Sequence, residues 1–169
     1  MHKVFIVGFM TAGKTREGKR LAKLMNMKFI DLDRMIEEHE KKTVAEIFSE
    51  KGESYFRDAE KNCLHELNLG NTIVSTGGGT PCFHDNMKWM MQKGICIWLK
   101  ISVDTVMKRI SESKKERPLL KNLAGEELRN FIESKMNERE KFYSLAQIHI
   151  HSENISIEKL KEEIEKLLD

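Results

Sequence analysis

The chain has 169 residues, of which 40% are hydrophobic and 33% are charged, and its formal net charge is +2. This composition is typical of a folded globular protein and excludes a largely disordered chain. The near balance of 29 basic and 27 acidic residues gives no electrostatic reason to bind nucleic acid or an anionic membrane. The length fits a single domain over residues 1–169, and we expect a monomer with neither kind of partner.

The three cysteines, Cys63, Cys82 and Cys96, are odd in number and widely spaced. This arrangement fits neither a disulfide framework nor a CxxC metal site. The first apolar run, residues 4–7, is typical of a strand and lacks the long hydrophobic stretch and cleavage site of a signal peptide. We therefore expect a reducing compartment and a cytoplasmic location.

Short apolar runs alternate along the chain with longer segments of helical periodicity. Strands are expected at residues 4–7, 29–31, 73–74, 95–99 and 148–151. Helices are expected from residue 14 to about 25, at 34–41, 44–51, 55–69, 86–93 and 103–110, from after 125 to about 143, and at 157–168. Strands that alternate with helices predict an α/β fold, in which helices cover both faces of a parallel sheet.

Local signals set several of these boundaries. Thr43 and Glu46 have the spacing of a capping box at the start of one helix, and Gly52 is expected to end that helix. Ser102 is the expected N-cap of the helix at 103–110. Residues 111–125 are charged, contain Pro118 and lack a clear period, so we predict a mobile loop there.

Residues 8–15, GFMTAGKT, match the phosphate-binding pattern G-x-x-x-x-G-K-[ST] without a gap. The pattern lies between a predicted strand and a predicted helix, as such loops require. Backbone N–H groups of the loop can then surround phosphates, helped by the positive end of the helix dipole. In this interpretation Lys14 reaches the β- and γ-phosphates, and the Thr15 hydroxyl binds Mg²⁺. The sequence therefore predicts a site for a nucleoside triphosphate.

A phosphate loop alone does not separate kinases from GTPases or other ATPases. The chain has no Asn-Lys-x-Asp motif for guanine, and no aspartate ends the strand at residues 73–75. Asp31 and Asp33, at the end of the second predicted strand, are the available carboxylates near the phosphates. Without further information they could equally be a strand-end turn and a helix N-cap.

Several further motifs follow the phosphate loop in a specific order. They are FIDLD at 29–33, IFSEKGESYFR at 47–57, STGGG at 75–79, RPLL at 117–120 and R-x-x-x-Y at 139–143. Together with GFMTAGKT this series resembles the shikimate kinase family, over residues 1 to about 143. The resemblance implies a three-layer α/β/α fold with a five-stranded parallel sheet in the order 2-3-1-4-5. It also implies a lid at about 111–125 and substrate-binding helices at about 33–61.

The resemblance implies transfer of the γ-phosphate of ATP to the 3-hydroxyl of shikimate, with Mg²⁺ as cofactor. The products would be ADP and shikimate 3-phosphate, on the route to chorismate and the aromatic amino acids. Asp33 would be the base, and Lys14 with the lid arginine Arg117 would stabilise the transferred phosphate. Thr15 and Asp31 would hold Mg²⁺, Asp31 through water.

The same resemblance assigns two sets of binding residues. The ATP-binding set is Gly8, Met10, Thr11, Ala12, Gly13, Lys14, Thr15, Arg16, Arg109 and Arg117, with Arg109 placed near the adenine. The substrate-binding set is Asp33, Phe56, Arg57, Gly77, Gly78, Gly79 and Arg139. Arg57 and Arg139 would bind the carboxylate of the substrate, because a guanidinium group matches a carboxylate with two parallel hydrogen bonds.

Simpler interpretations remain open for several of these residues. Arg57 and Glu60, three residues apart, could be a surface ion pair, and Arg139 lies among charges that suggest a solvated face. Phe48 and Phe56 could be plain core residues, and Met87, Met90 and Met91 look like core filler. His149 and His151 share one strand face and could bind a metal, but surface positions are the alternative that we favour.

Two residues of the phosphate loop region depart from the family pattern. Thr11 stands where glycine is usual, and a β-branched residue is strained there if φ is positive. Arg16 replaces a small hydroxyl residue, and the sequence offers no physical account of its benefit. A related kinase of gluconate or nucleoside monophosphates, and a nucleotide sensor without catalysis, are the alternative functions.

Overall fold

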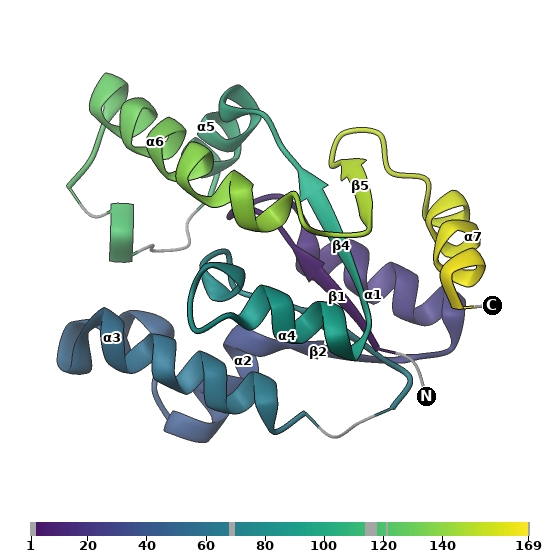
Figure 1. Cartoon of the computed structure of the whole chain (residues 1–169). Helices are drawn as coiled ribbons and strands as arrows, with labels where there is room; N and C mark the ends of the chain where they lie inside the picture. Colours follow the sequence, from purple (N-terminus) through teal and green to yellow (C-terminus); the bar gives the residue numbers. More distant parts are fainter. Residues whose placement is uncertain (1–2, 68–69, 114–117, 121, 169) are drawn as a thin grey trace.

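The computed structural model describes residues 3–67, 70–113, 118–120 and 122–168 (Figure 1). Its centre is a five-stranded sheet in the order β2-β3-β1-β4-β5. Every strand pair is parallel, which confirms both the predicted sheet type and the predicted strand order. The strands are β1 (Lys3–Val7), β2 (Lys28–Asp31), β3 (Thr72–Ser75), β4 (Ile95–Lys100) and β5 (Ile148–His151).

Strand β1 is the central strand because it pairs with β3 on one side and β4 on the other. Its side chains alternate between two cores, with Phe5 and Val7 in one and Val4 and Ile6 in the other. All four side chains are almost completely buried. Because both faces of β1 are covered, the strand needs apolar residues at each of positions 4–7, which explains its continuous apolar run.

Helices cover both faces of the sheet and complete the three layers. They are α1 (Lys14–Met25), α2 (Leu32–Glu40), α3 (Val44–His65), α4 (Asn86–Lys93), α5 (Val103–Ser111), α6 (Gly125–Tyr143) and α7 (Ile157–Leu168), with short 3₁₀ turns η1 (Thr80–Cys82) and η2 (Pro118–Leu120). Helices α1 and α7 lie together on one side of the sheet, and α2, α3, α4 and α6 lie on the other (Figure 1).

Helix α3 joins two segments that the sequence predicted as separate helices. The capping box is present, since Glu46 N donates to Thr43 Oγ1 over 3.2 Å and Thr43 N donates to Glu46 Oε2 over 2.7 Å. Gly52 does not end the helix but kinks it, with φ 80° and ψ 173°. The helix ends at His65, so the predicted end at residue 69 is wrong; residues 68 and 69 lie outside the described part of the chain.

Helix α2 begins at Leu32, earlier than the predicted residue 34. The cause is Asp31, whose side chain caps the helix by accepting a hydrogen bond from Arg34 N over 3.4 Å. The N-cap is therefore Asp31 and not Asp33, which lies within the first turn, so the alternative of a cap at Asp33 is wrong. The predicted N-cap Ser102 of α5 is also present, accepting from Thr105 N.

The remaining sequence interpretations concern core and surface residues. Met87 and Met90 are buried in the core, as predicted, and Met91 packs against it. His149 bonds to Ala146 O over 2.9 Å, and in the described ranges no group of three or more His, Cys, Asp or Glu residues could hold a metal ion. Among the helices of those ranges, none is long and apolar enough to cross a membrane.

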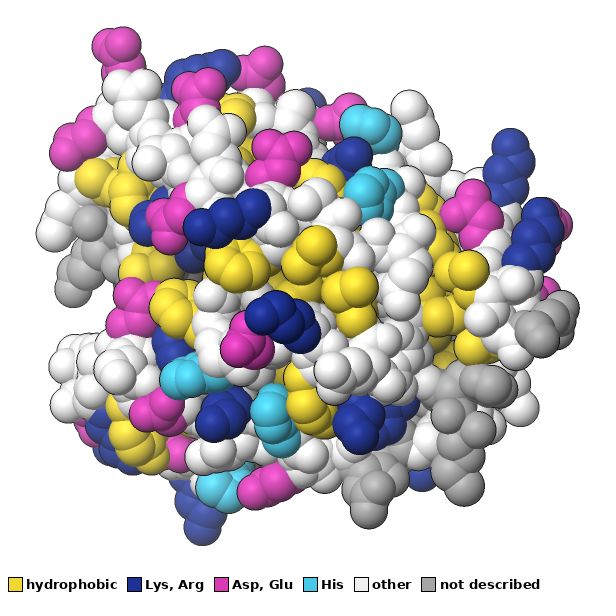
Figure 2. Space-filling view, in the orientation of Figure 1, with side chains coloured by type: hydrophobic (Ala, Val, Ile, Leu, Met, Phe, Trp, Pro, Cys, Tyr) yellow, Lys and Arg dark blue, Asp and Glu magenta, His cyan; other side chains and the backbone are white. Residues whose placement is uncertain are grey.

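Charged side chains are interspersed on the surface. On the face shown in Figure 2, basic and acidic residues alternate, and the visible hydrophobic side chains lie between them. This distribution agrees with the small net charge of +2.

The kink at Gly52 leads to a prediction about stability. A Cβ on Gly52 would meet no atom within 4 Å, so Gly52→Ala strains only the backbone, whose φ is 80°. We expect it to lower the free energy of unfolding by about 1 kcal/mol, which is roughly 2–4 °C in Tm. Thermal unfolding measures this, with Ser54→Ala on the exposed face of the same helix as control. An unchanged Tm for Gly52→Ala would contradict a strained kink.

Candidate active site

A cavity of about 840 Å³ opens at the carboxyl ends of β1, β2 and β3. This is the edge of a parallel sheet at which α/β proteins bind ligands. Most of the predicted site residues line it: Met10, Thr11, Gly13, Lys14, Thr15, Arg16, Asp31, Asp33, Phe56, Arg57, Gly77, Gly78, Gly79 and Arg139. The structure thus brings the two predicted binding sets into one cavity.

The phosphate loop, residues 8–13, turns the chain from β1 into α1. A Cβ on Gly8 would lie 2.6 Å from Leu99 O, so only glycine fits there. Gly13 has φ 92° and precedes the first turn of α1. The Lys14 ammonium closes the loop by donating to Gly8 O over 2.8 Å and to Phe9 O over 2.9 Å. The loop is thus folded around a cation at a helix N-terminus, which favours an anionic ligand.

A hydroxyl and a carboxylate face each other behind the loop. Thr15 Oγ1 donates to Asp31 Oδ2 over 2.7 Å and lies 3.5 Å from Ser75 Oγ. The other oxygen of Asp31 caps α2, so one side chain both contacts Thr15 and begins the helix. This group of oxygen atoms, at the wall of the cavity, has the chemistry that Mg²⁺ prefers.

Two carboxylates from different helices meet at Gly77, just after β3. A Cβ on Gly77 would lie 2.9 Å from Asp33 Oδ1 and 2.6 Å from Glu60 Oε1. Glycine at this position therefore lets both carboxylates approach the backbone. Glu60 also lines the cavity and is 1% exposed, yet the sequence analysis treated it only as a surface partner of Arg57.

Arg57 is 5% exposed, so the surface-pair interpretation is wrong. Its Nη1 donates to Glu60 Oε2 over 2.6 Å, and its Nη2 donates to Glu53 Oε1 over 2.8 Å. The guanidinium also lies against three aromatic rings, at 5.9, 5.4 and 4.5 Å from the centres of Phe48, Phe56 and Phe83 respectively. Phe56 is therefore both a core residue and part of the wall behind Arg57.

The buried ion pair shifts the acid–base equilibria of both partners. Burial raises the pKa of the Glu60 carboxyl, and the nearby Asp33 charge adds to this rise. Arg57 and a hydrogen bond from the Thr80 hydroxyl oppose it. For Arg57, burial opposes the charged form, but Glu60 and Glu53 outweigh burial and raise the pKa. Arg57 therefore stays a cation at the cavity wall.

Arg139 is 7% exposed, so the alternative of a solvated face is wrong. Its guanidinium lies 5.4 Å from the ring centre of Phe9. A Cβ on Gly78 would lie 3.4 Å from Arg139 Nη1, and the Tyr143 hydroxyl donates to Gly78 O. Burial raises the pKa of Tyr143, which keeps this hydroxyl protonated. Arg139 thus lines the same cavity as Arg57, from α6.

Two predicted arginines remain to be described. Arg117 is outside the residues that the structure describes, and Leu119, in η2, lines the cavity from the same segment. Arg109 is not part of the cavity wall, and its Nη1 donates to Thr11 O over 2.7 Å. Its side chain is thus fixed to the phosphate loop, and its contact with adenine stays a prediction. Gly8 and Ala12 shape the loop without lining the cavity.

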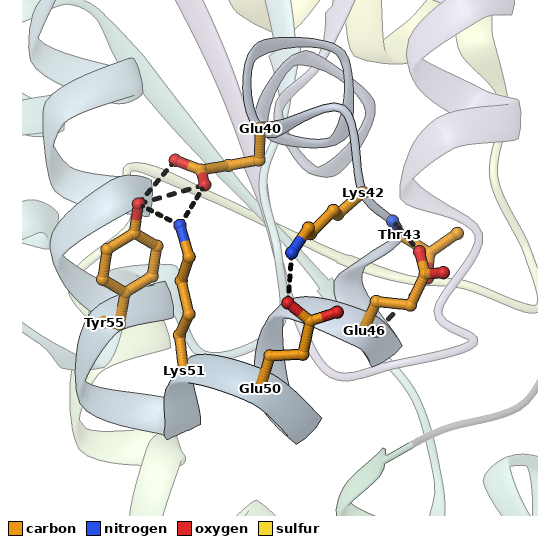
Figure 3. Close-up of polar contacts among 7 residues, drawn as sticks. All are labelled: Glu40, Lys42, Thr43, Glu46, Glu50, Lys51 and Tyr55. Carbon is orange, nitrogen blue, oxygen red and sulfur yellow. Dashed lines mark hydrogen bonds and ion pairs between the residues drawn. The ribbon is translucent and has the colours of Figure 1, made fainter.

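The helices that carry Asp33 and Arg57 are tied together on their outer side (Figure 3). Glu40, the last residue of α2, accepts from Lys51 Nζ over 2.9 Å and from the Tyr55 hydroxyl over 2.9 Å. Lys51 precedes the kink at Gly52 and Tyr55 follows it, so one carboxylate holds both halves of α3. Lys42 and Glu50 form a separate contact before the kink.

A phosphate loop, a hydroxyl–carboxylate pair and two buried arginines around one cavity define a small-molecule kinase of the P-loop class. The shikimate kinase family model matches residues 10–169. The shikimate kinase of Parabacteroides distasonis is 47% identical over 159 residues, which cover 94% of this chain and 92% of the relative. The chain therefore belongs to the shikimate kinase family.

Solved structures agree with this family. The shikimate kinase from Bacteroides thetaiotaomicron is 40% identical with a TM-score of 0.89, over 99% of this chain and 98% of that one. The shikimate kinase from Acinetobacter baumannii, solved in complex with shikimate, is 30% identical with a TM-score of 0.86. That match covers 99% of this chain and 93% of the relative.

The buried pair of Arg57 and Glu60 leads to a second prediction. Glu60→Ala leaves the Arg57 cation buried with only Glu53 as partner, so we expect a loss of about 3 kcal/mol in the free energy of unfolding. Glu53 is 44% exposed, so Glu53→Ala removes the other partner at a cost below about 1 kcal/mol. Urea unfolding measures both. Equal losses of unfolding free energy in the two variants would show that the Arg57–Glu60 pair is not the main stabilising contact.

Proposed function

We propose that this chain transfers the γ-phosphate of ATP to the 3-hydroxyl of shikimate, producing ADP and shikimate 3-phosphate. The observation that carries the proposal is the pair of buried guanidinium groups, Arg57 and Arg139, on the wall of the cavity that also holds Lys14 and Thr15. Two cations at one end suit an acceptor that carries a carboxylate. The shikimate-bound structure of the Acinetobacter baumannii relative supports this choice of acceptor.

At the nucleotide end, the loop residues Met10, Thr11, Ala12 and Gly13 offer backbone N–H groups to the phosphates. In the structure the Lys14 ammonium donates to two loop carbonyls. When nucleotide binds, it donates to the β- and γ-phosphates in their place. Thr15 and Asp31 would hold Mg²⁺, Asp31 through water, and the ion would supply positive charge beside the phosphates. Gly8 and Gly13 set the turn, and Arg16, at the cavity wall, adds positive charge beside the nucleotide.

At the acceptor end, Asp33 receives the proton of the attacking hydroxyl. The oxygen of that hydroxyl forms a bond to the γ-phosphorus, the bond from this phosphorus to the β-phosphate oxygen breaks, and ADP leaves. Arg57 and Arg139 bind the acceptor's carboxylate and orient the ring. The glycines at 77–79 allow the ring to approach the backbone, and Phe56 supports it.

Charge stabilisation accounts for most of the catalysis in this proposal. Negative charge spreads over the transferred phosphoryl oxygens in the transition state, and Lys14, Mg²⁺ and the lid arginine Arg117 stabilise it. Closure of the lid at about 111–125 would exclude water as a competing acceptor. The single domain over residues 1–169, the monomeric state and the cytoplasmic location also stay predictions.

The decisive experiment is an ADP-release assay with ATP, Mg²⁺ and a panel of acceptors. Shikimate should support turnover, whereas its uncharged methyl ester, gluconate and nucleoside monophosphates should not. The ester is the matched control because it keeps the hydroxyl groups and removes the carboxylate charge. Turnover with another acceptor, or ATP binding without any turnover, would reject this function.

Asp33→Asn tests the proposed base. The substitution keeps the size of the side chain and removes its ability to take a proton, so we expect kcat to fall by roughly 100-fold or more. The affinity for ATP should change less than about twofold, because Asp33 faces the acceptor in this proposal. Steady-state kinetics and calorimetric ATP titration measure both. Full activity in this variant would show that Asp33 is not the base.

Arg139→Ala tests the carboxylate contact. We expect the KM for shikimate to rise about 30-fold, equivalent to about 2 kcal/mol, with little change in the KM for ATP. Arg129→Ala is the matched control, since Arg129 lies on the same helix, is 46% exposed and pairs with Asp104 away from the cavity wall. If Arg139→Ala leaves the shikimate KM unchanged, the carboxylate lies elsewhere.

A further inference from the structure

Thr11 has a backbone conformation that its residue type disfavours. Its φ is 63°, in the left-handed region, and it is a β-branched residue at the middle of the phosphate loop. The sequence analysis predicted strain there if φ were positive, and the structure confirms that condition. Glycine would adopt this conformation without strain, so threonine requires a reason of its own.

The backbone around Thr11 is held on two sides. From within the loop, Lys14 bonds to the carbonyls of Gly8 and Phe9, and Ala12 N donates to Phe9 O over 3.3 Å. From outside, Arg109 of α5 donates to the Thr11 carbonyl over 2.7 Å. The strained residue is therefore fixed in place by the surrounding structure.

The Thr11 hydroxyl makes no hydrogen bond within the part of the chain that the structure describes. Its oxygen is buried and has no hydrogen-bond partner among those residues. A buried hydroxyl without a partner destabilises the protein, and such groups require an explanation. Thr11 also lines the cavity, next to Gly13 and Lys14. A hydroxyl can donate a hydrogen bond, and phosphate oxygens are strong acceptors.

We propose that the Thr11 hydroxyl donates a hydrogen bond to a β- or γ-phosphate oxygen of the bound nucleotide. The loop then offers a side-chain donor in addition to its backbone N–H groups, and Arg109 is a positioning residue for it. This inference rests on one part of the proposed function only, that a nucleoside triphosphate occupies the cavity. It does not depend on shikimate.

The alternative is that the strain is merely tolerated. The substitution Thr11→Gly removes both the strain and the hydroxyl, and the two explanations predict opposite changes in its affinity for ATP. If strain alone matters, the Thr11→Gly variant adopts the loop conformation without strain and binds ATP at least as tightly as the natural chain. If the hydroxyl binds phosphate, Thr11→Gly is more stable without nucleotide but binds ATP more weakly.

The test is calorimetric titration of the full chain with Mg-ATP and with AMP, combined with thermal unfolding without nucleotide. We expect Thr11→Gly to weaken ATP binding about tenfold while it leaves AMP binding unchanged, since a hydrogen bond to a charged phosphate is lost. Thr11→Ser, which keeps the hydroxyl, should recover most of the loss. Equal or tighter ATP binding by Thr11→Gly, no recovery with serine, or weaker AMP binding would each overturn the proposal.

Lys41→Gly is the matched control for strain. Lys41 also has a left-handed backbone, with φ 54°, and it lies at the C-terminal end of α2 outside the cavity wall. This variant should raise Tm without changing ATP affinity, as strain relief alone predicts. Natural protein that fails to bind ATP would reject the proposed function itself, whereas normal ATP binding by both natural protein and Thr11→Gly would reject only this inference.

Discussion

The active site depends on a tight turn between the central strand β1 and α1. Residues 4–7 of β1 are buried, and the strand pairs on both edges, so the chain that leaves it has little freedom in direction. Gly8 must pass the carbonyl of Leu99, and Gly13 must adopt a left-handed conformation before the helix can begin. The loop between them is thereby forced to surround the Lys14 ammonium. Phosphate binding is in this sense a consequence of how β1 is packed.

A second constraint comes from charges that are buried behind the cavity. Glu60 accepts hydrogen bonds from Arg57 and from Thr80, and it approaches Gly77 together with Asp33. One carboxylate thus connects helix α3 with the segment that follows β3. Because an unpaired charge in this position would be strongly destabilising, the network orients Arg57 toward the cavity rather than toward solvent.

The sequence predicted the layers, the sheet and most site residues, because strand patterns and ordered motifs are local. It failed where burial depends on tertiary packing. Arg139 looked solvated among charged neighbours, yet it continues the spacing of Ile132, Met136 and Tyr143 along one face of α6. Glu60 lies in the same way between Phe56, Cys63 and Leu64 on α3. A charge in register with an apolar stripe was the available signal at both positions; the family motif led to Arg139 without it, whereas Glu60 was missed.

Other differences have causes that no local pattern contains. Gly52 has the sequence signature of a helix end, but the chain re-enters a helix. Phe48 and Phe56 pack across the kink with their ring centres 4.8 Å apart and their planes tilted by 44°, and Glu40 holds its outer side. The end of α3 was placed too late because the apolar spacing continues to Leu67, which is buried without being helical. Tertiary contacts thus decide both ends of this segment.

The structure also supplies the physical account of Arg16 that the sequence lacked. Arg16 Nε donates to Glu17 Oε1 over 2.6 Å, and Arg20 Nη1 donates to the other oxygen of Glu17 over 2.7 Å. Glu17 is 1% exposed and lies in the first turn of α1, where the helix dipole favours a negative charge. A buried carboxylate so close to a phosphate site would repel the ligand if it were unpaired. Two arginines around it cancel that repulsion, and since Arg16 is 67% exposed, part of its charge remains available at the cavity wall. Arg16 therefore has to be understood together with Glu17, as the cation that makes a buried acid acceptable beside bound phosphate.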